Sequence, residues 1–131
     1  MTHTILVVED NPQNMKLASV LLRSEGYEVR GAGDAASARR LIEAALPDLI
    51  LMDVGLPGMD GLTFTRELRA DPRTRTVPII ALTAFAMKGD DLKALDAGCD
   101  DYIAKPFETM RLLQAVADVL AGARRSQGVD P

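Results

Sequence analysis

Five short apolar runs alternate with segments of helical periodicity along the 131 residues of the chain, and this alternation restricts the possible folds most strongly. The first run, residues 4–8, is apolar after its first residue, as expected for a strand that is covered on both faces. Such alternation is typical of βαβ units, in which helices connect parallel strands. Five units fit one doubly wound α/β domain, whereas a closed eightfold barrel needs about twice the length.

Local signals predict where the strands and helices lie. The apolar runs predict strands at residues 4–8, 27–30, 48–52, 77–82 and 102–104, and the alternating second run indicates a half-exposed strand near an edge. Asn11 before Pro12 predicts the start of the first helix, and Gly26 predicts its end. Asp34 can cap the second helix, and the fourth helix is predicted at about residues 88–97. Residues 123–131 are small, polar or charged, which predicts a flexible tail.

Composition excludes several classes of protein. Lys and Arg total 15 against 19 Asp and Glu, and the resulting net charge of -4 argues against binding to nucleic acid. Cys99 and His3 are the only residues of their types, so an intrachain disulfide, a Cys-rich metal site and a site with two histidines are excluded. No apolar stretch approaches the ~18 residues of a membrane span, and no secretion signal begins the chain. We therefore expect a cytoplasmic protein that does not associate with membranes.

Four of the five predicted strands carry polar groups at their carboxyl ends, where open parallel sheets form their sites. If the first and third strands are neighbours, their ends lie about 5 Å apart. Three carboxylates then share one crevice. The polar residues at these strand ends are Glu9, Asp10, Asp53, Thr83 and Lys105.

Crowded carboxylates either raise a pKa or recruit a cation. Oxygen ligands without a thiol or imidazole select a hard cation, so Mg²⁺ is the expected cofactor. Three carboxylates carry about -3 charges, and Mg²⁺ with the Lys105 ammonium adds about +3, so such a site can accept a dianionic phosphoryl group. Each residue alone commonly has a structural role, as a helix cap, a turn residue or a solvated charge. Their joint placement favours the functional interpretation.

These residues lie in four segments that resemble the receiver domain of two-component response regulators. The likeness covers residues 4–122 in the family's order, and residues 14–17 and 84–90 are most like stand-alone receivers of the DivK type and receivers of hybrid kinases. The resemblance implies a flavodoxin-like fold, with a five-stranded parallel sheet of order 2-1-3-4-5 and five helices, in a receiver domain over residues 1–122. The segments are 5–11 (ILVVEDN), 47–61 (PDLILMDVGLPGMDG), 79–84 (IIALTA) and 101–107 (DYIAKPF).

The resemblance also implies a phosphoacceptor and its metal ligands. Asp53 would attack a phosphohistidine on a partner histidine kinase or phosphotransfer protein and become an acyl phosphate. Asp10, Asp53 and the backbone carbonyl of Gly55 would hold Mg²⁺ directly, and Glu9 would act through water. Catalysis of this kind is positioning together with charge neutralisation.

Further roles implied by the resemblance concern the phosphoryl group itself. Lys105 would pair with a phosphoryl oxygen, and the peptide bond between Lys105 and Pro106 would be cis. Ala84 is small enough to leave the site open to a kinase histidine. Thr83 would donate its hydroxyl to a phosphoryl oxygen, and Tyr102 would then turn inward, as a switch. An ordinary half-buried strand aromatic is the structural alternative for Tyr102.

The same resemblance implies where the signal is read. The fourth helix, fifth strand and last helix would form the face that contacts a downstream protein. No residues remain for an output domain, so the output would be supplied by another protein, or the chain would be a receiver fragment of a larger hybrid kinase or regulator. The expected residues of this output face are Met87, Lys88, Leu92, Tyr102 and Phe107.

Three other functions compete with a phosphoacceptor module. A Mg²⁺-dependent phosphatase with an aspartyl nucleophile needs a second Asp two residues further on, but that position is Gly55. A glycine is also expected there because the loop must turn sharply. Flavin binding needs a hydroxyl-rich phosphate loop, whereas Glu9 and Asp10 would repel the phosphate. An inert protein-contact domain would lack some of the site residues, and none is missing.

Overall fold

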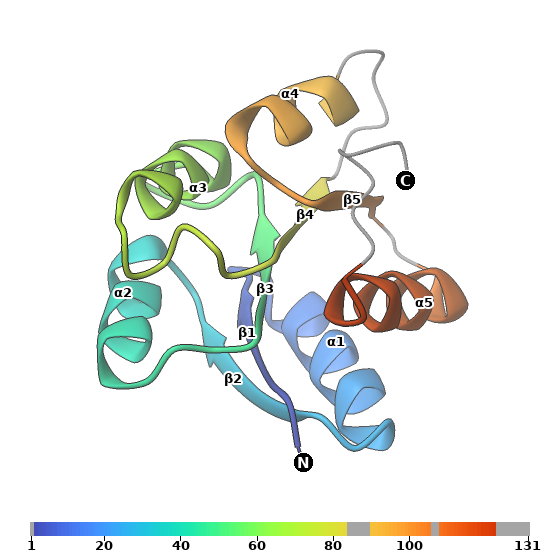
Figure 1. Ribbon diagram of the computed structural model, residues 1–131. Helices are drawn as coiled ribbons and strands as arrows, with labels where there is room; N and C mark the ends of the chain where they lie inside the picture. The colour runs from blue at the N-terminus through green and yellow to red at the C-terminus, as the bar shows by residue number, and fades with distance from the viewer. Residues whose placement is uncertain (1, 84–89, 106–107, 123–131) are drawn as a thin grey trace.

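The structure is a computed structural model that describes residues 2–83, 90–105 and 108–122. Within these ranges, five parallel strands form one sheet of order β2-β1-β3-β4-β5, which confirms the expected flavodoxin-like architecture (Figure 1). The strands are β1 (Thr4–Val8), β2 (Glu28–Ala32), β3 (Leu49–Asp53), β4 (Ile79–Thr83) and β5 (Asp101–Ala104). The helices are α1 (Pro12–Ser24), α2 (Ala35–Ala44), α3 (Gly61–Ala70), α4 (Asp90–Ala97) and α5 (Thr109–Leu120).

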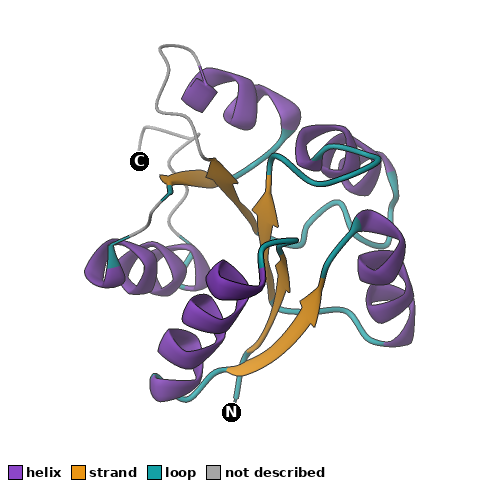
Figure 2. Cartoon of the chain, turned by 180° about the vertical axis from the view of Figure 1, so that it is seen from behind, coloured by secondary structure: helices purple, strands orange, loops and turns teal. Residues whose placement is uncertain are grey.

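The helices cover both faces of the sheet. Helices α1 and α5 pack on one face, and α2, α3 and α4 pack on the other, so the molecule has three layers (Figures 1 and 2). This arrangement follows from the right-handed crossovers that connect parallel strands. Because both faces of the sheet are covered, the central strands β1, β3 and β4 are almost entirely buried.

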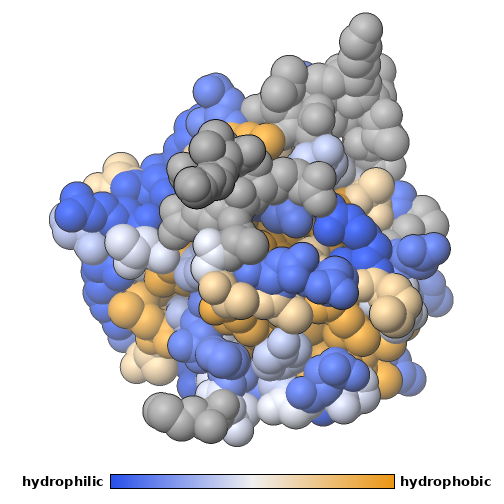
Figure 3. Space-filling model, turned by 45° about the vertical axis from the view of Figure 1, so that its right-hand side comes forward, coloured by the Kyte–Doolittle hydropathy of each residue, from blue (hydrophilic) through white to orange (hydrophobic). Residues whose placement is uncertain are grey.

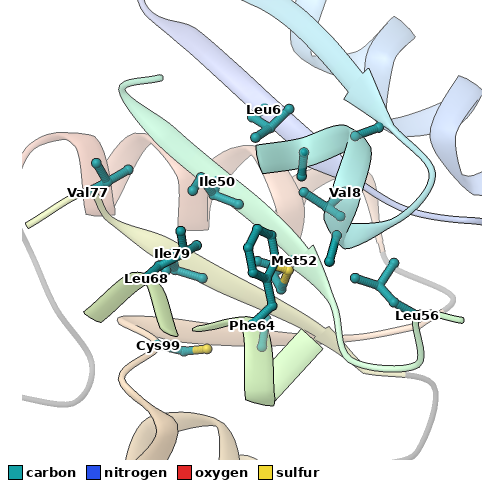
Figure 4. Packing of buried hydrophobic residues seen from close by; sticks show 14 of the residues in the cluster. Leu6, Val8, Ile50, Met52, Leu56, Phe64, Leu68, Val77, Ile79 and Cys99 are labelled. Carbon is teal, nitrogen blue, oxygen red and sulfur yellow. The ribbon is translucent and has the colours of Figure 1, made fainter. Parts of the chain in front are cut away.

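Alternate residues of each strand supply the two halves of the core. In β1, Ile5 and Val7 belong to the apolar cluster beneath α1 and α5, whereas Leu6 and Val8 belong to the cluster beneath α2, α3 and α4. This is the period of two that strand geometry imposes. Phe64 of α3 is fully buried and lies against β3 and β4 in the second cluster (Figure 4).

Strand β1 has the predicted boundaries, and the boundaries of the other four strands differ from the prediction by one to two residues. Strand β2 is an edge strand, as expected, but extends to Ala32 because it continues its ladder with β1. Strands β3 and β4 run one residue further than predicted, since Asp53 still pairs with Leu82 in the ladder. Two of the expected polar residues, Asp53 and Thr83, are therefore the last residues of their strands. Residues 88–89 and the predicted tail at 123–131 lie outside the described residues.

The surface combines charged groups with a few exposed apolar side chains. Figure 3 brings the side of α1 and α5 forward and shows apolar patches among polar ones. Large apolar side chains are exposed at Leu17 and Val20 of α1 and at Met110 of α5. None of the helices in the described part of the chain combines the length and apolar character that crossing a bilayer requires.

Candidate functional site

Register places the site residues together at the carboxyl edge of the sheet. Val8 of β1 pairs with Met52 of β3, so the next residues of the two strands, Glu9 and Asp53, are neighbours. Lys105 follows β5, two strands further along the sheet, and its long side chain reaches back across β4. The expectation that acidic groups from β1 and β3 meet there follows directly from this strand order.

Glu9 is a buried carboxylate with partners on both oxygens. Its side chain is 1% exposed, and its Oε1 accepts a hydrogen bond from Lys105 Nζ at 3.0 Å. Its Oε2 accepts from the backbone N–H of Asn11 at 3.0 Å. Asn11 in turn caps α1, because its side chain accepts hydrogen bonds from Gln13 and Asn14 N–H. The hydrogen bond from the Asn11 N–H to Glu9 therefore connects the N-cap of α1 with the acidic site.

Asp53 is held by one ammonium and one backbone amide. Its side chain is buried, and its Oδ1 lies 3.2 Å from Lys105 Nζ. The backbone N–H of Gly55 donates to the same oxygen at 3.0 Å. The Gly55 contact ties the carboxylate to the loop that follows β3, and the Lys105 contact ties it to the end of β5. The Lys105 ammonium therefore bridges Glu9 and Asp53.

The electrostatics of Lys105 favour its charged form. Burial by itself lowers the pKa of Lys105, but the hydrogen bond that Lys105 donates to Glu9 and the negative charges of Asp53 and Glu9 outweigh burial, so the pKa is raised above its usual value. The group is consequently an ammonium at any physiological pH. A fixed positive charge beside Asp53 is suited to an incoming anionic group.

Three carboxylates of this site are close enough to share a cation. One ligand oxygen each from Glu9, Asp10 and Asp53 lies within 4.8 Å of the others, with Asp10 exposed and the other two buried. Hard oxygen donors without a thiol or imidazole fit a hard divalent ion such as Mg²⁺. In the part of the site that the structure describes, one ammonium against three carboxylates leaves an excess of about two negative charges, which such an ion would balance.

Other residues predicted for the site are only partly described. Thr83 lies at the end of β4, 8% exposed, and its carbonyl accepts from Lys105 N–H at 2.7 Å. Tyr102 of β5 is half-buried against the core that faces α2, α3 and α4. Several predicted features lie outside the described residues: Ala84, Met87, Lys88, Pro106, Phe107, the Lys105–Pro106 peptide bond and the side chain of Leu92.

The loop after β3 turns at Val54 and Gly55, as the sequence predicts. The φ of Gly55 lies outside the left-handed region, and a Cβ there would only contact Asp53 Oδ1 at 3.8 Å. Gly58 has the positive φ, at 77°. The turn at Gly55 therefore agrees with the expectation, but the left-handed conformation that favours glycine lies three positions later.

Sequence reasoning also missed a residue that packs against the phosphoacceptor candidate. Gly61, the first residue of α3, approaches the backbone of Asp53 so closely that a Cβ would lie 2.1 Å from its carbonyl oxygen. A glycine at the first position of a helix, directly after the capping residue Asp60, was the available signal.

Comparisons with known proteins agree with this geometry. The family model of the response regulator receiver domain matches residues 5–117. The polar-differentiation response regulator DivK of Brucella ovis is 42% identical over 123 residues, which cover 94% of this chain and 100% of that protein.

Solved receiver domains superpose on nearly the whole chain. The receiver domain of sensor histidine kinase PA1611 from Pseudomonas aeruginosa PAO1 has a TM-score of 0.82 at 46% identity, covers 93% of this chain and 99% of its own, and holds a magnesium ion coordinated in the active site cleft. The chemotaxis response regulator CheY4 of Vibrio cholerae has a TM-score of 0.85 at 28% identity, over 91% of this chain and 99% of its own.

Fold and comparisons together define a signalling protein of the receiver class. The chain belongs to the response regulator receiver domain family and acts in two-component signal transduction. Receiver domains interact with histidine kinases and with downstream targets.

Proposed function

We propose that Asp53 accepts a phosphoryl group from the phosphohistidine of a partner histidine kinase or phosphotransfer protein, and that the modified chain signals by protein contact. The observation that carries this proposal is the convergence of the Glu9, Asp10 and Asp53 carboxylates with the Lys105 ammonium at one edge of the sheet. A carboxylate nucleophile needs its negative charge offset before an anionic donor can approach. Lys105, 3.2 Å from Asp53 Oδ1, offsets part of that charge.

The transfer exchanges one bond to phosphorus for another. An oxygen of Asp53 attacks the phosphorus, the P–O bond forms as the P–N bond to the donor imidazole breaks, and the imidazole leaves with the electron pair and takes up a proton. The Gly55 N–H keeps Asp53 Oδ1 oriented, at 3.0 Å. Lys105 can follow the phosphoryl oxygens because its ammonium is a compact charge on a flexible chain.

The same residues fit a bound Mg²⁺. Asp10, Asp53 and the carbonyl of Gly55 would hold the ion directly, and Glu9 would act through water. When bound, Mg²⁺ neutralises charge on the phosphoryl oxygens. Glu9 has a second task in this scheme, because its two oxygens hold Lys105 and the Asn11 turn in place.

We further propose that Thr83 and Tyr102 transmit the modification to an output face formed by α4, β5 and α5. Thr83 ends β4, and Tyr102 lies on the adjacent β5. The Tyr102 side chain is half-buried and packs against the core that faces α2, α3 and α4. Thr83→Ala should still take up phosphate but lose the phosphorylation-dependent change in binding to its downstream partner, whereas Thr83→Ser should retain it. An unchanged response in Thr83→Ala would refute the coupling.

Intact mass measurement tests the central proposal. Incubation with Mg²⁺ and acetyl phosphate should add one phosphoryl group to the protein, and Asp53→Asn or chelation of the metal should abolish the gain. Asp48→Asn is the matched control, because Asp48 lies at the opposite end of β3 and accepts a hydrogen bond from Thr4 N–H at 2.7 Å. Repeated turnover of a phosphate ester without the adduct would instead favour the aspartyl phosphatase.

A further inference from the structure

Gly61 begins α3 directly against the backbone of Asp53, and we propose that it is a positioning residue for the phosphoacceptor. The inference rests on the proposed function of Asp53. A Cβ on Gly61 would lie 2.1 Å from the Asp53 carbonyl oxygen, 2.9 Å from its carbonyl carbon and 3.0 Å from Val54 Cα. Non-bonded atoms are repelled strongly at such separations, so only glycine permits this approach.

The backbone beside Gly61 is held on two sides and cannot easily move away. The Val54 N–H donates to the Leu82 carbonyl of β4 at 2.9 Å. The Gly61 N–H donates to the Val54 carbonyl at 3.0 Å, which closes the loop between β3 and α3. Asp60 then caps α3 by accepting from Thr63 N–H at 2.9 Å. An added methyl group must therefore displace either the start of α3 or the end of β3.

Displacement of the end of β3 reaches the reacting carboxylate. Asp53 is the last residue of that strand, and its Oδ1 is aligned by Gly55 N–H at 3.0 Å and Lys105 Nζ at 3.2 Å. A misplacement of about 1 Å in a reacting group can slow a reaction about 100-fold. Gly61 thus acts through the backbone of Asp53, without contact to the phosphoryl group.

Other glycines of the chain separate this effect from the general loss of a glycine. A Cβ on Gly33 would meet nothing within 4 Å, and the φ of Gly33 lies outside the left-handed region. Gly33→Ala therefore changes the same chemical group without a steric consequence. Thr74→Ala supplies a control for lost stability, because Thr74 is buried and donates to the Leu68 carbonyl at 2.6 Å, away from Asp53.

The experiment compares Gly61→Ala, Gly33→Ala and Thr74→Ala. In Gly61→Ala, the rate of phosphorylation by acetyl phosphate at saturating Mg²⁺ should fall at least about tenfold, with weaker Mg²⁺ binding measured by calorimetry. Without metal, the amide resonances of Val54 and Gly55 should shift and exchange their hydrogens faster. Gly33→Ala should match the wild type, and Thr74→Ala should lose stability but keep the phosphorylation rate of its folded fraction.

Several results would overturn the proposal. One is a normal rate in folded Gly61→Ala, and another is a loss of rate in Thr74→Ala that matches its loss of stability. If Gly61→Ala does not fold, Mg²⁺ titration of the wild type is followed by amide NMR: the Gly61 resonance should move with the same midpoint as Gly55, and a stationary Gly61 resonance overturns the inference. If the proposed function itself fails, the wild type and Gly33→Ala both lack the phosphoryl adduct. The amide resonances of Val54 and Gly55 measured without metal still test the role of Gly61 in that case.

Discussion

Two buried clusters of a cation with carboxylates lie at opposite edges of the same sheet. At the carboxyl edge, Lys105 bridges Glu9 and Asp53. At the amino edge, the Arg69 guanidinium lies 3.1 Å from Asp100, whose side chain is 3% exposed. Both clusters contain a buried acid and a base, but they differ in how completely their polar atoms and charges are balanced.

The cluster at the amino edge is balanced by backbone groups. Arg69 donates to the carbonyls of Gly98, Arg75 and Val77 at 2.7 to 3.0 Å. Asp100 accepts from the backbone N–H of Ile79 at 2.9 Å. The planar fork of arginine suits such a fixed set of acceptors, and it connects the end of α3 with the start of β4 and the end of α4.

The cluster at the carboxyl edge keeps an excess of negative charge. Among the described residues, three carboxylates face one flexible ammonium there, and Asp10 is exposed. Buried charge that is matched group by group indicates a structural role, whereas unmatched charge in a partly open position indicates a ligand. Charge balance thus distinguishes the structural cluster at the amino edge from the functional cluster at the carboxyl edge. Variants in each cluster can test this distinction.

The largest expected effect is the loss of the pair at the amino edge. Asp100→Ala leaves the Arg69 charge without its carboxylate and the Ile79 N–H without an acceptor, so the free energy of unfolding should fall by about 3 kcal/mol. Urea denaturation measures this loss. The exposed Asp96 on α4 provides the control Asp96→Ala, which should change stability little. Mg²⁺ affinity should stay unchanged in both variants. A weaker affinity in Asp100→Ala would show that the two clusters do not have independent roles.

At the carboxyl edge, we expect a substitution to weaken Mg²⁺ binding without lowering the stability of the metal-free protein. Without metal, Asp10→Asn should unfold no more easily than the wild type, because it relieves repulsion among three carboxylates. Mg²⁺ at about ten times its Kd should stabilise the wild type by about 1.4 kcal/mol, and this gain should largely vanish in Asp10→Asn. Thermal denaturation with and without Mg²⁺ measures both quantities, with Asp96→Asn as the control. Marked destabilisation of metal-free Asp10→Asn would contradict the charge-excess argument.

The two clusters also differ in how far the sequence could predict them. Polar residues at the ends of apolar runs identify Glu9 and Asp53, because parallel strands bring their carboxyl ends to one edge. The pair of Arg69 and Asp100 leaves no such signal, since an arginine in a last helical turn and an acid before a strand are each common. Their partners are backbone carbonyls and amides, which every residue type carries. The contact of Gly61 with Asp53 likewise depends on where α3 returns to the sheet.

The buried thiol of Cys99 supplies the smallest prediction and a probe of the amino edge. Burial raises the pKa of Cys99 to about 11; its hydrogen bond with Thr65 and the charge of Arg69 lower the pKa less than burial raises it, and Asp100 adds to the increase. A thiol beside an unmatched cation would instead have a lowered pKa. The raised value thus reflects the burial of the thiol, which outweighs the nearby charge of Arg69.

This raised pKa implies a stability that falls in alkali. The folded state keeps the thiol protonated while the unfolded chain ionises near its ordinary pKa, so the unfolded state binds fewer protons as the pH rises, and stability declines between the two pKa values. With an ordinary thiol pKa of 9.0 in the unfolded chain and a pKa of about 11 in the fold, the thiol should account for about 0.8 kcal/mol of lost unfolding free energy from pH 8 to 9.5. Urea denaturation of Cys99→Ala at both pH values should show a decline smaller by this amount, whatever the variant's stability at pH 8. Equal declines in both proteins would mean that the thiol ionises as readily in the fold as in water, and burial at the amino edge would then not raise its pKa.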